Sequence, residues 1–157
     1  VVNLYDPGLR FEPIHRLIHA DDPTDWIAGL ASALGGDVAE CTLNDLRHDL
    51  SHDQSTIGCV TADRCAVIRR GGSRELPVAS LQAYINGQES IDVDYIHGWD
   101  TSIQLGRKAR SAVVMLPAID PHLLYPTVSK RGVLPRKAFS LGEAEEKRYY
   151  LEARRIS

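Results

Sequence analysis

Two neighbouring side chains near the start of the chain could bind an anion and move a proton. They are His15 and Arg16, in the run Pro13-Ile14-His15-Arg16. Arginine presents a planar fork of donors that fits a phosphate or a carboxylate, and histidine changes its charge near neutral pH. Because neighbours in a strand point to opposite faces, we expect only one of the two to line a site. The alternative is that both are packed or solvated residues without a chemical role.

A third candidate, His97, lies where a predicted strand ends. The segment Asp94-Tyr95-Ile96-His97-Gly98-Trp99-Asp100 leaves that strand and enters a predicted helix. Ligands of α/β proteins often bind at the carboxyl ends of strands. His97, flanked by two aspartates, could therefore be a general base or a metal ligand. The alternative is a capping turn with a surface histidine.

Two further cations, Arg136 and Lys137, precede a helix-start signal. In that signal, Ser140 and Glu143 have the spacing of a capping box. Cations beside a helix N-terminus suit a phosphate group. Since the Ser140 side chain would itself satisfy part of that N-terminus, a solvated basic loop is the alternative.

The sequence does not favour a metal site or nucleic-acid binding. His48 and His52 have a spacing that can bind zinc on a helix, but no third ligand is near, and the surrounding aspartates indicate a solvated acidic face. Motifs for dinucleotides, P-loop phosphates, a nucleophilic serine and zinc proteases are absent. Aromatic residues make up 6% of the chain and are not interleaved with basic residues, which makes nucleic acid an unlikely partner.

Hydrophobic patterns predict the strands and helices that position these residues. The expected strands are 1–5, 9–18 (with Pro13 as an edge position or a break), 38–43, 55–62, 64–70, 91–96 and 112–116. The expected helices are 22–34, 44–50, 77–86, 100–108, 120–131 and 140–156. In the helix at 120–131, Leu123, Leu124 and Val128 should face inward. The order predicts an α/β or α+β fold, a mixed β-sheet with helices packed on it, in a single domain covering 1–157.

The cysteines and the apolar runs indicate the setting. Cys41, Cys59 and Cys65 form no CxxC pair, which predicts reduced, buried thiols and a cytoplasmic protein. A hairpin turning at residues 62–63 would pair Val60 with Cys65, so that Cys59 and Cys65 face opposite sides and cannot bridge. The longest apolar run, 112–119, is far shorter than a membrane span, so we expect no membrane partner.

Charge is distributed unevenly along the chain, whose formal net charge is -3. Residues 1–100 carry 7 basic and 16 acidic side chains, whereas residues 101–157 carry 11 basic and 5 acidic ones. The two parts could attract each other within one domain, or the basic part could face a phosphate, a nucleotide or a nucleic acid. The scattered positions of the basic residues favour the first interpretation.

Four segments together resemble a prokaryotic family, the domain of unknown function one thousand and fifteen. They are PIHRLI, DYIHG, MLPAID and LPRKAFSLGEAEEKRYYLEARRI, and they occur in the family's order between about Tyr5 and Ile156. Members of that family are longer and carry in their front half an Asp-Gly-(His or Asn)-His type motif, similar to the ParB and sulfiredoxin group of nucleotide-using proteins. Nothing here matches that motif. Because the chain also opens on Val1 within a predicted strand, we expect it to be the C-terminal part of a longer protein.

The resemblance implies a function and a set of residues. Some relatives in the wider group are free-serine kinases, which implies phosphoryl transfer from a nucleotide, with Mg²⁺, to a small hydroxylated metabolite of serine metabolism. By the motif positions, the resemblance implies that His15, Arg16, His97 and Lys137 gather around one pocket. We expect His15 or His97 to handle a proton as the catalytic group, and Arg16, Arg136 and Lys137 to hold the phosphate charge.

Two other hypotheses remain open. One is a non-catalytic binding or scaffold domain that packs on an N-terminal domain of the same protein and exposes an apolar patch when isolated. The other, which the sequence supports little, is a nucleic-acid-binding module. Association into a homo-oligomer is a further possibility that the sequence leaves open.

Overall fold

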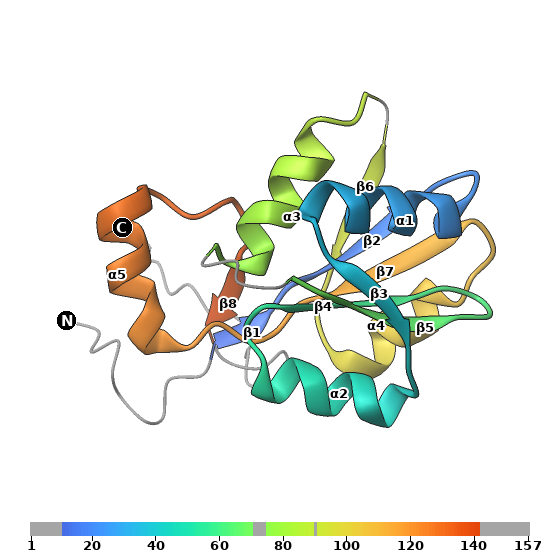
Figure 1. Cartoon of the computed structure of the whole chain (residues 1–157), viewed down its shortest axis with the longest axis horizontal. Helices are drawn as coiled ribbons and strands as arrows, with labels where there is room; N and C mark the ends of the chain where they lie inside the picture. Colours follow the sequence, from blue (N-terminus) through green and yellow to red (C-terminus); the bar gives the residue numbers. More distant parts are fainter. Residues whose placement is uncertain (1–10, 71–74, 90, 142–157) are drawn as a thin grey trace, which may run out of the picture.

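A six-stranded β-sheet with helices packed on it forms the body of the protein (Figure 1). The computed structural model describes residues 11–70, 75–89 and 91–141. The strands are β1 (Phe11–Pro13), β2 (His15–His19), β3 (Asp37–Glu40), β4 (Thr56–Val60), β5 (Cys65–Arg69), β6 (Asp92–Ile96), β7 (Ser111–Met115) and β8 (Phe139–Leu141). The helices are α1 (Pro23–Leu34), α2 (Leu43–His52), α3 (Pro77–Asn86), α4 (Trp99–Gly106) and α5 (Pro121–Arg131).

Side-chain caps begin three of the helices. The Asp22 carboxylate accepts backbone N–H groups at the start of α1, where Pro23 occupies the first helical position. Thr42 and Asp45 form a capping box at α2, two residues before the start that the sequence predicts. Asp120 caps α5 as expected. Each of these caps joins residues two or three positions apart. The sequence can therefore predict where these helices start to within about two residues.

The six strands are ordered β3-β5-β4-β7-β2-β6, and each junction between these described strands is antiparallel. The predicted class, an α/β layer fold with helices packed on a sheet, is confirmed. The pairing refines the expected mixed sheet to an antiparallel one. β6 and β7 run in the same direction and are joined by helix α4, which is the pattern that predicts two adjacent parallel strands. In the structure, however, β2 lies between them and pairs with both in the antiparallel sense.

A separate hydrophobic core lies on each face of the sheet. On one face, α1 and α3 pack on strand residues that include Ile18, Ile57 and Val114. On the other face, α2 and α4 pack on residues that include Leu17 and Val113. Since successive residues of a strand point to opposite sides, β2 and β7 supply side chains to both cores in turn. The predicted central strand is confirmed, because all five residues of β7 are buried.

A short ladder of β1 and β8 extends the molecule beyond the main sheet. Phe11 pairs with Leu141, and Glu12 pairs with Ser140. The predicted break at Pro13 is confirmed, since Pro13 ends β1 and a single residue separates it from β2. The predicted strand at 1–5 and the helix that should follow Ser140 lie outside the described residues.

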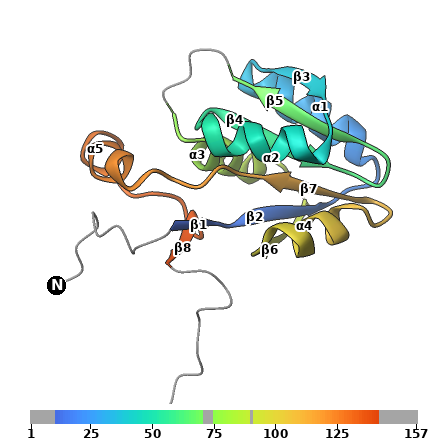
Figure 2. The ribbon, with the colours of Figure 1, turned by 90° about the horizontal axis from the view of Figure 1, so that it is seen from below.

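Helix α5 departs from the sequence-based expectation. Leu124 is buried, but Leu123 and Val128 are 40% and 39% exposed, so the prediction that all three face inward was wrong. The helix lies to one side of the main sheet rather than on it (Figure 2), and Pro126 inside it removes one backbone donor. With Tyr125 at 68% exposed and Val133 at 93%, this region presents apolar side chains to solvent.

The hairpin of β4 and β5 has the predicted register. Val60 pairs with Cys65, and Cys59 lies in the core under α1 and α3, whereas Cys65 packs against the opposite core. The prediction that Cys59 and Cys65 cannot bridge is therefore confirmed. Within the described ranges, no helix is both long enough and apolar enough to cross a membrane.

Gly106 sets how closely α4 approaches the sheet. A Cβ atom at this position would lie 2.5 Å from Val113 Cγ1 and 2.9 Å from the Val60 carbonyl oxygen. We expect Gly106→Ala to lower the free energy of unfolding by about 1–3 kcal/mol in urea denaturation, because backbone and β-branched atoms cannot yield easily. Gly87→Ala is the matched control, since its nearest contact would be an ordinary 3.4 Å. Equal urea midpoints for the two variants would contradict this packing argument.

Candidate functional site

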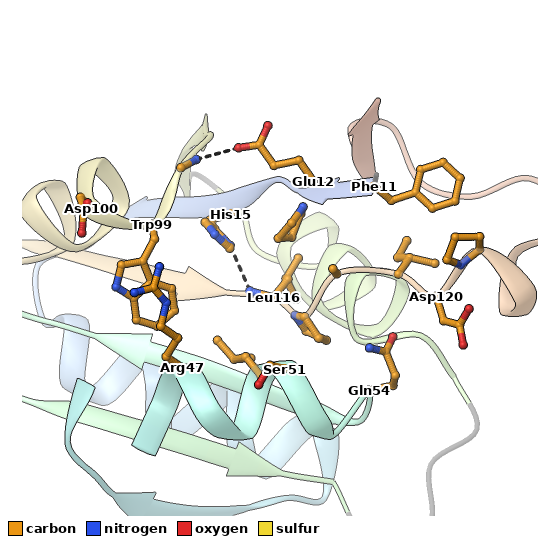
Figure 3. A pocket seen from close by; sticks show the side chains of 17 residues that line it. Phe11, Glu12, His15, Arg47, Ser51, Gln54, Trp99, Asp100, Leu116 and Asp120 are labelled. Carbon is orange, nitrogen blue, oxygen red and sulfur yellow. Dashed lines mark hydrogen bonds between the residues drawn. The ribbon is translucent and has the colours of Figure 1, made fainter. Parts of the chain in front are cut away.

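A cavity of about 780 Å³ lies at the carboxyl ends of β6 and β7 (Figure 3). The residues that follow β6 and β7 form part of its wall, β1 and the start of β2 form another part, and α2 forms the side opposite β2. The lining residues used below are Glu12, His15, Arg47, Ser51, Gln54, Trp99, Asp100 and Asp120. Loops that leave two strands at the same end of a sheet commonly build ligand sites, because the rigid strands hold them in place.

His15 reaches this cavity as a neutral hydrogen-bond donor. Its side chain is buried, and its Nδ1 accepts the Leu116 N–H at 3.1 Å, so Nε2 carries the proton. Burial, the adjacent Arg16 guanidinium and nearby His97 lower the pKa of His15 from 6.5 to about 4. At neutral pH this imidazole can donate to a ligand but is a poor general base.

Glu12 is a carboxylate held in place by two partners. Its Oε1 accepts the Gly98 N–H at 3.2 Å, and its Oε2 lies 3.2 Å from His97 Nδ1. Gly98 has φ +80°, a conformation that favours glycine. Glu12 lines the cavity and His97 does not, so the predicted residue His97 contacts the site through a carboxylate that the sequence analysis missed. This arrangement resembles a base that a second group orients.

Arg47 and Trp99 form a flat wall of the cavity. The Arg47 guanidinium carbon lies 5.1 Å from the centre of the Trp99 ring, and Figure 3 shows the two side chains facing each other across the space between α2 and α4. Ser51, one turn after Arg47 on α2, and Gln54, just after that helix, add a hydroxyl and an amide group to the cavity lining. An aromatic ring beside a guanidinium suits a planar base and an anionic group attached to it.

Arg16 and Lys137 gather around Tyr95 instead. Arg16 is fully buried, its guanidinium carbon lies 4.6 Å from the Tyr95 ring centre, and its Nη2 is 3.5 Å from Gln82 Oε1 on α3. The Lys137 Nζ lies 4.1 Å from the same ring centre. Burial lowers the pKa of Arg16 to about 10, and within the described residues its Nε has no hydrogen-bond partner.

The structure therefore divides the predicted site residues into two groups. His15 and the Glu12–His97 pair lie at the cavity, while Arg16 and Lys137 lie together at Tyr95 and do not line it. The expectation that His15 and Arg16 point to opposite faces is confirmed. Arg136 is exposed and does not line the cavity.

Sequence reasoning missed Glu12 and Arg47, and also the hydroxyl of Ser51 on α2 and the amide of Gln54 just after that helix. Trp99 and Asp100 belong to the segment singled out around His97, so the signal for them was present. Glu12 lies three residues before His15, on the far side of Pro13, and only the β1–β2 break brings both to one cavity. No pattern in the sequence indicates that α2 would form the opposite wall.

Hard oxygen ligands are available for a cation. Asp100 and Asp120 line opposite ends of the cavity, which Glu12 also lines (Figure 3). Mg²⁺ in nucleotide sites is usually bound by one or two carboxylates together with phosphates. In the part of the chain that the structure describes, no cluster of three or more metal-ligating side chains occurs. The His48 and His52 rings stack at 4.1 Å on the exposed side of α2.

Solved structures share this fold at low sequence identity. A conserved hypothetical protein from Pyrococcus furiosus superposes with a TM-score of 0.65 at 12% identity, covering 91% of this chain and 60% of that one. Two variant forms of a free serine kinase in complex with AMP give TM-scores of 0.60 and 0.58 at 11% and 12% identity, each covering 90% of this chain and 57% of the kinase. The chain thus spans less than two thirds of these proteins. No protein-family model and no curated protein sequence matches it.

His15 should make stability depend on pH. Because its pKa in the folded protein is about 4 rather than 6.5, the unfolded chain binds this proton more tightly. The contribution of His15 to the free energy of unfolding is complete above pH 6.5 and is lost as the pH falls towards about 4, by about 3 kcal/mol at most. His15→Asn keeps an acceptor for the Leu116 N–H but does not titrate. In urea denaturation, the free energy of unfolding of this variant should therefore fall less between pH 6.5 and pH 4 than that of the wild type.

The matched control is His52→Asn, which removes an exposed histidine on α2. It should follow the wild-type pH dependence. If His15→Asn also follows the wild type, the buried neutral imidazole is not the source of the effect.

Proposed function

We propose that this chain is the nucleotide-binding part of a phosphotransferase that acts on a small hydroxylated metabolite, with free serine as the first candidate. The observation that carries the proposal is the cavity at the carboxyl ends of β6 and β7, which combines the Arg47–Trp99 wall with an oriented carboxylate. The fold shared with a free serine kinase in complex with AMP supports it. The resemblance to the domain of unknown function one thousand and fifteen belongs to the same proposal, in which the chain is the C-terminal part of a longer protein.

The nucleotide would lie against the Arg47–Trp99 wall. Its base would stack on the indole of Trp99 in place of the Arg47 guanidinium, which would turn to bind a phosphate oxygen. Because Asp100 and Asp120 lie at opposite ends of the cavity (Figure 3), only one of them would hold Mg²⁺ together with the phosphates. The predicted roles of Arg16, Arg136 and Lys137 as phosphate ligands stay predictions, since none of the three lines this cavity.

Glu12 would accept the proton of the attacking hydroxyl. The hydroxyl oxygen of the metabolite forms a bond to phosphorus, the bond from phosphorus to the bridging oxygen of the nucleotide breaks, and the hydroxyl proton passes to the Glu12 carboxylate. His97 and the Gly98 N–H hold that carboxylate in one orientation. The Nε2–H of His15 would donate to a phosphoryl oxygen as negative charge develops there.

A second candidate is a scaffold domain without catalysis. The exposed apolar side chains in and after α5, among them Tyr125 and Val133, favour it because such side chains commonly cover a neighbouring domain. The two candidates differ in one expectation, since only the first requires a nucleotide in the cavity.

AMP should bind this chain and quench or shift the fluorescence of Trp99. The chain has two tryptophans, and Trp26 packs in the core between α1 and the sheet, so Trp26→Phe leaves Trp99 as the reporter. We expect Arg47→Ala to weaken AMP binding about tenfold in calorimetry, which equals about 1.4 kcal/mol, because it removes a charged donor to phosphate.

Arg69→Ala is the matched control for that experiment. It removes the same charge from an arginine that pairs with Asp49 and does not line the cavity, so AMP affinity should be unchanged. Absence of AMP binding to the folded wild-type chain, or equal affinities for both variants, would reject the nucleotide site and favour the scaffold.

Glu12→Gln should separate catalysis from nucleotide binding. An amide cannot accept the hydroxyl proton, so transfer of phosphate from ATP or ADP to free serine should fall by about 10²–10⁴-fold, while AMP affinity stays within about threefold. The assay measures the phosphoserine formed in the presence of Mg²⁺, once with this chain and once with the native full-length protein.

Glu89→Gln is the control, an exposed carboxylate outside the cavity. If Glu12→Gln retains full transfer activity, the proton goes elsewhere. If Glu12→Gln loses both the transfer activity and AMP binding, Glu12 serves the nucleotide site rather than the proton transfer.

A further inference from the structure

Cys41 and Cys65 face each other across two neighbouring strands. The Cys41 N–H donates to the Cys65 carbonyl oxygen at 3.0 Å, which extends the β3–β5 register by one pair beyond Glu40 and Ala66. Their Sγ atoms lie 3.7 Å apart. Directly opposed residues of an antiparallel hydrogen-bonded pair have Cα atoms about 5.5 Å apart, within the range that disulfides span.

These two thiols can be reached from solvent. Both side chains are only partly buried, so the prediction of buried thiols holds for Cys59 alone and was wrong for these two. Both line a second cavity of about 420 Å³ that is separate from the main cavity. Arg64 and Arg107 lie in the same wall. Glu40 and Asp63 line this cavity too, and Arg64 pairs with Glu40 at 3.1 Å, so the wall carries both signs of charge and Arg107 is the cation that acts on the thiols.

We propose that Cys41 and Cys65 form a reversible dithiol–disulfide pair that reacts with a low-molecular-weight disulfide such as oxidised glutathione. The Cys65 thiolate attacks one sulfur of the glutathione disulfide, a protein–glutathione bond forms, and one glutathione thiolate leaves. Cys41 then attacks the Cys65 sulfur, the intramolecular disulfide forms, and a second glutathione thiolate leaves. Two protein thiols are oxidised, one glutathione disulfide is reduced to two thiols, and the two protons pass to the leaving thiolates.

The electrostatics of the pair indicate the order of attack. Burial, with the neighbouring Cys65 thiol and two nearby aspartates, raises the pKa of Cys41 to about 12. Burial also raises the pKa of Cys65, but a hydrogen bond from Cys41 and the charge of Arg107 act in the opposite direction. Cys65 is therefore the first nucleophile. Because the raised pKa values leave little thiolate at neutral pH, the exchange should speed up as the pH rises.

The disulfide would tie the short segment between β3 and α2 to strand β5. β3 is at the edge of the sheet, and Cys41 is followed at once by Thr42, the cap of α2. Arg47 and Ser51 project from that helix into the main cavity. Oxidation would therefore fix the point from which α2 starts, whatever ligand the main cavity takes.

The test incubates the folded chain in a glutathione redox buffer at about pH 8, near the ordinary pKa of a thiol. The chain is then unfolded in denaturant with iodoacetamide, so that the buried Cys59 is trapped together with any other free thiol. We expect titratable thiols to fall from three to one per chain, the intact mass to drop by two hydrogen atoms, and peptide mapping to join Cys41 to Cys65. Cys41→Ser should instead stop at a glutathione adduct on Cys65, because the resolving sulfur is missing.

Cys59→Ala is the matched control, since it removes the buried thiol on the other face and should leave the disulfide intact. Three free thiols in a folded chain at the oxidising end of the titration would overturn the proposal. So would a stable glutathione adduct on wild-type Cys65, or a disulfide that joins two chains. Circular dichroism of each variant shows that it is folded before oxidation is scored.

Discussion

Strand β7 has no solvent-facing side, and the rest of the architecture depends on that constraint. All five of its residues are buried, so each face of the sheet at this strand needs a helical layer above it. β2 pairs with residues 111–114 of this strand on one edge and β4 pairs with residues 113–115 on the other, so that hydrogen-bonded neighbours hold it from both sides. Because β7 is fixed on four sides, the loop from Leu116 to Asp120 starts from a rigid position, and this loop forms one wall of the main cavity.

Local signals account for the elements that the sequence predicts. The Asp22 cap with Pro23, and the bounds of α3 at Pro77 and Asn86, depend on residues within one or two turns of each other. The hairpin register follows from alternation and a short turn, which are also local. The position of β2 between β6 and β7 depends on contacts across about 100 residues, and no pattern in one sequence encodes that choice. This is why the expected mixed sheet became an antiparallel one.

The candidate site shows the same division. The histidine at position 15 was predicted from its type and its arginine neighbour, and the alternation of β2 correctly separated the two. Glu12 was missed because its role depends on the Gly98 N–H, 86 residues away in the chain. For α5, the apolar pattern was sound as a helix signal but did not reveal that the helix would lie beside the sheet instead of on it. Sequence patterns thus predict which residues can do chemistry. They predict less well which distant residues will lie beside them and complete the site.

The β1–β8 ladder brings the two ends of the described chain to one corner of the molecule. Phe11 and Leu141 are paired residues, and the Phe11 and Phe139 rings lie 4.5 Å apart. A mechanical load that pulls residues 11 and 141 apart would therefore open the ladder one hydrogen bond at a time, starting from its outer pair, before it reached the main sheet. The same corner is a suitable junction for inserting the domain into another polypeptide or for a circular permutation, because joined ends that lie close together leave the fold undisturbed.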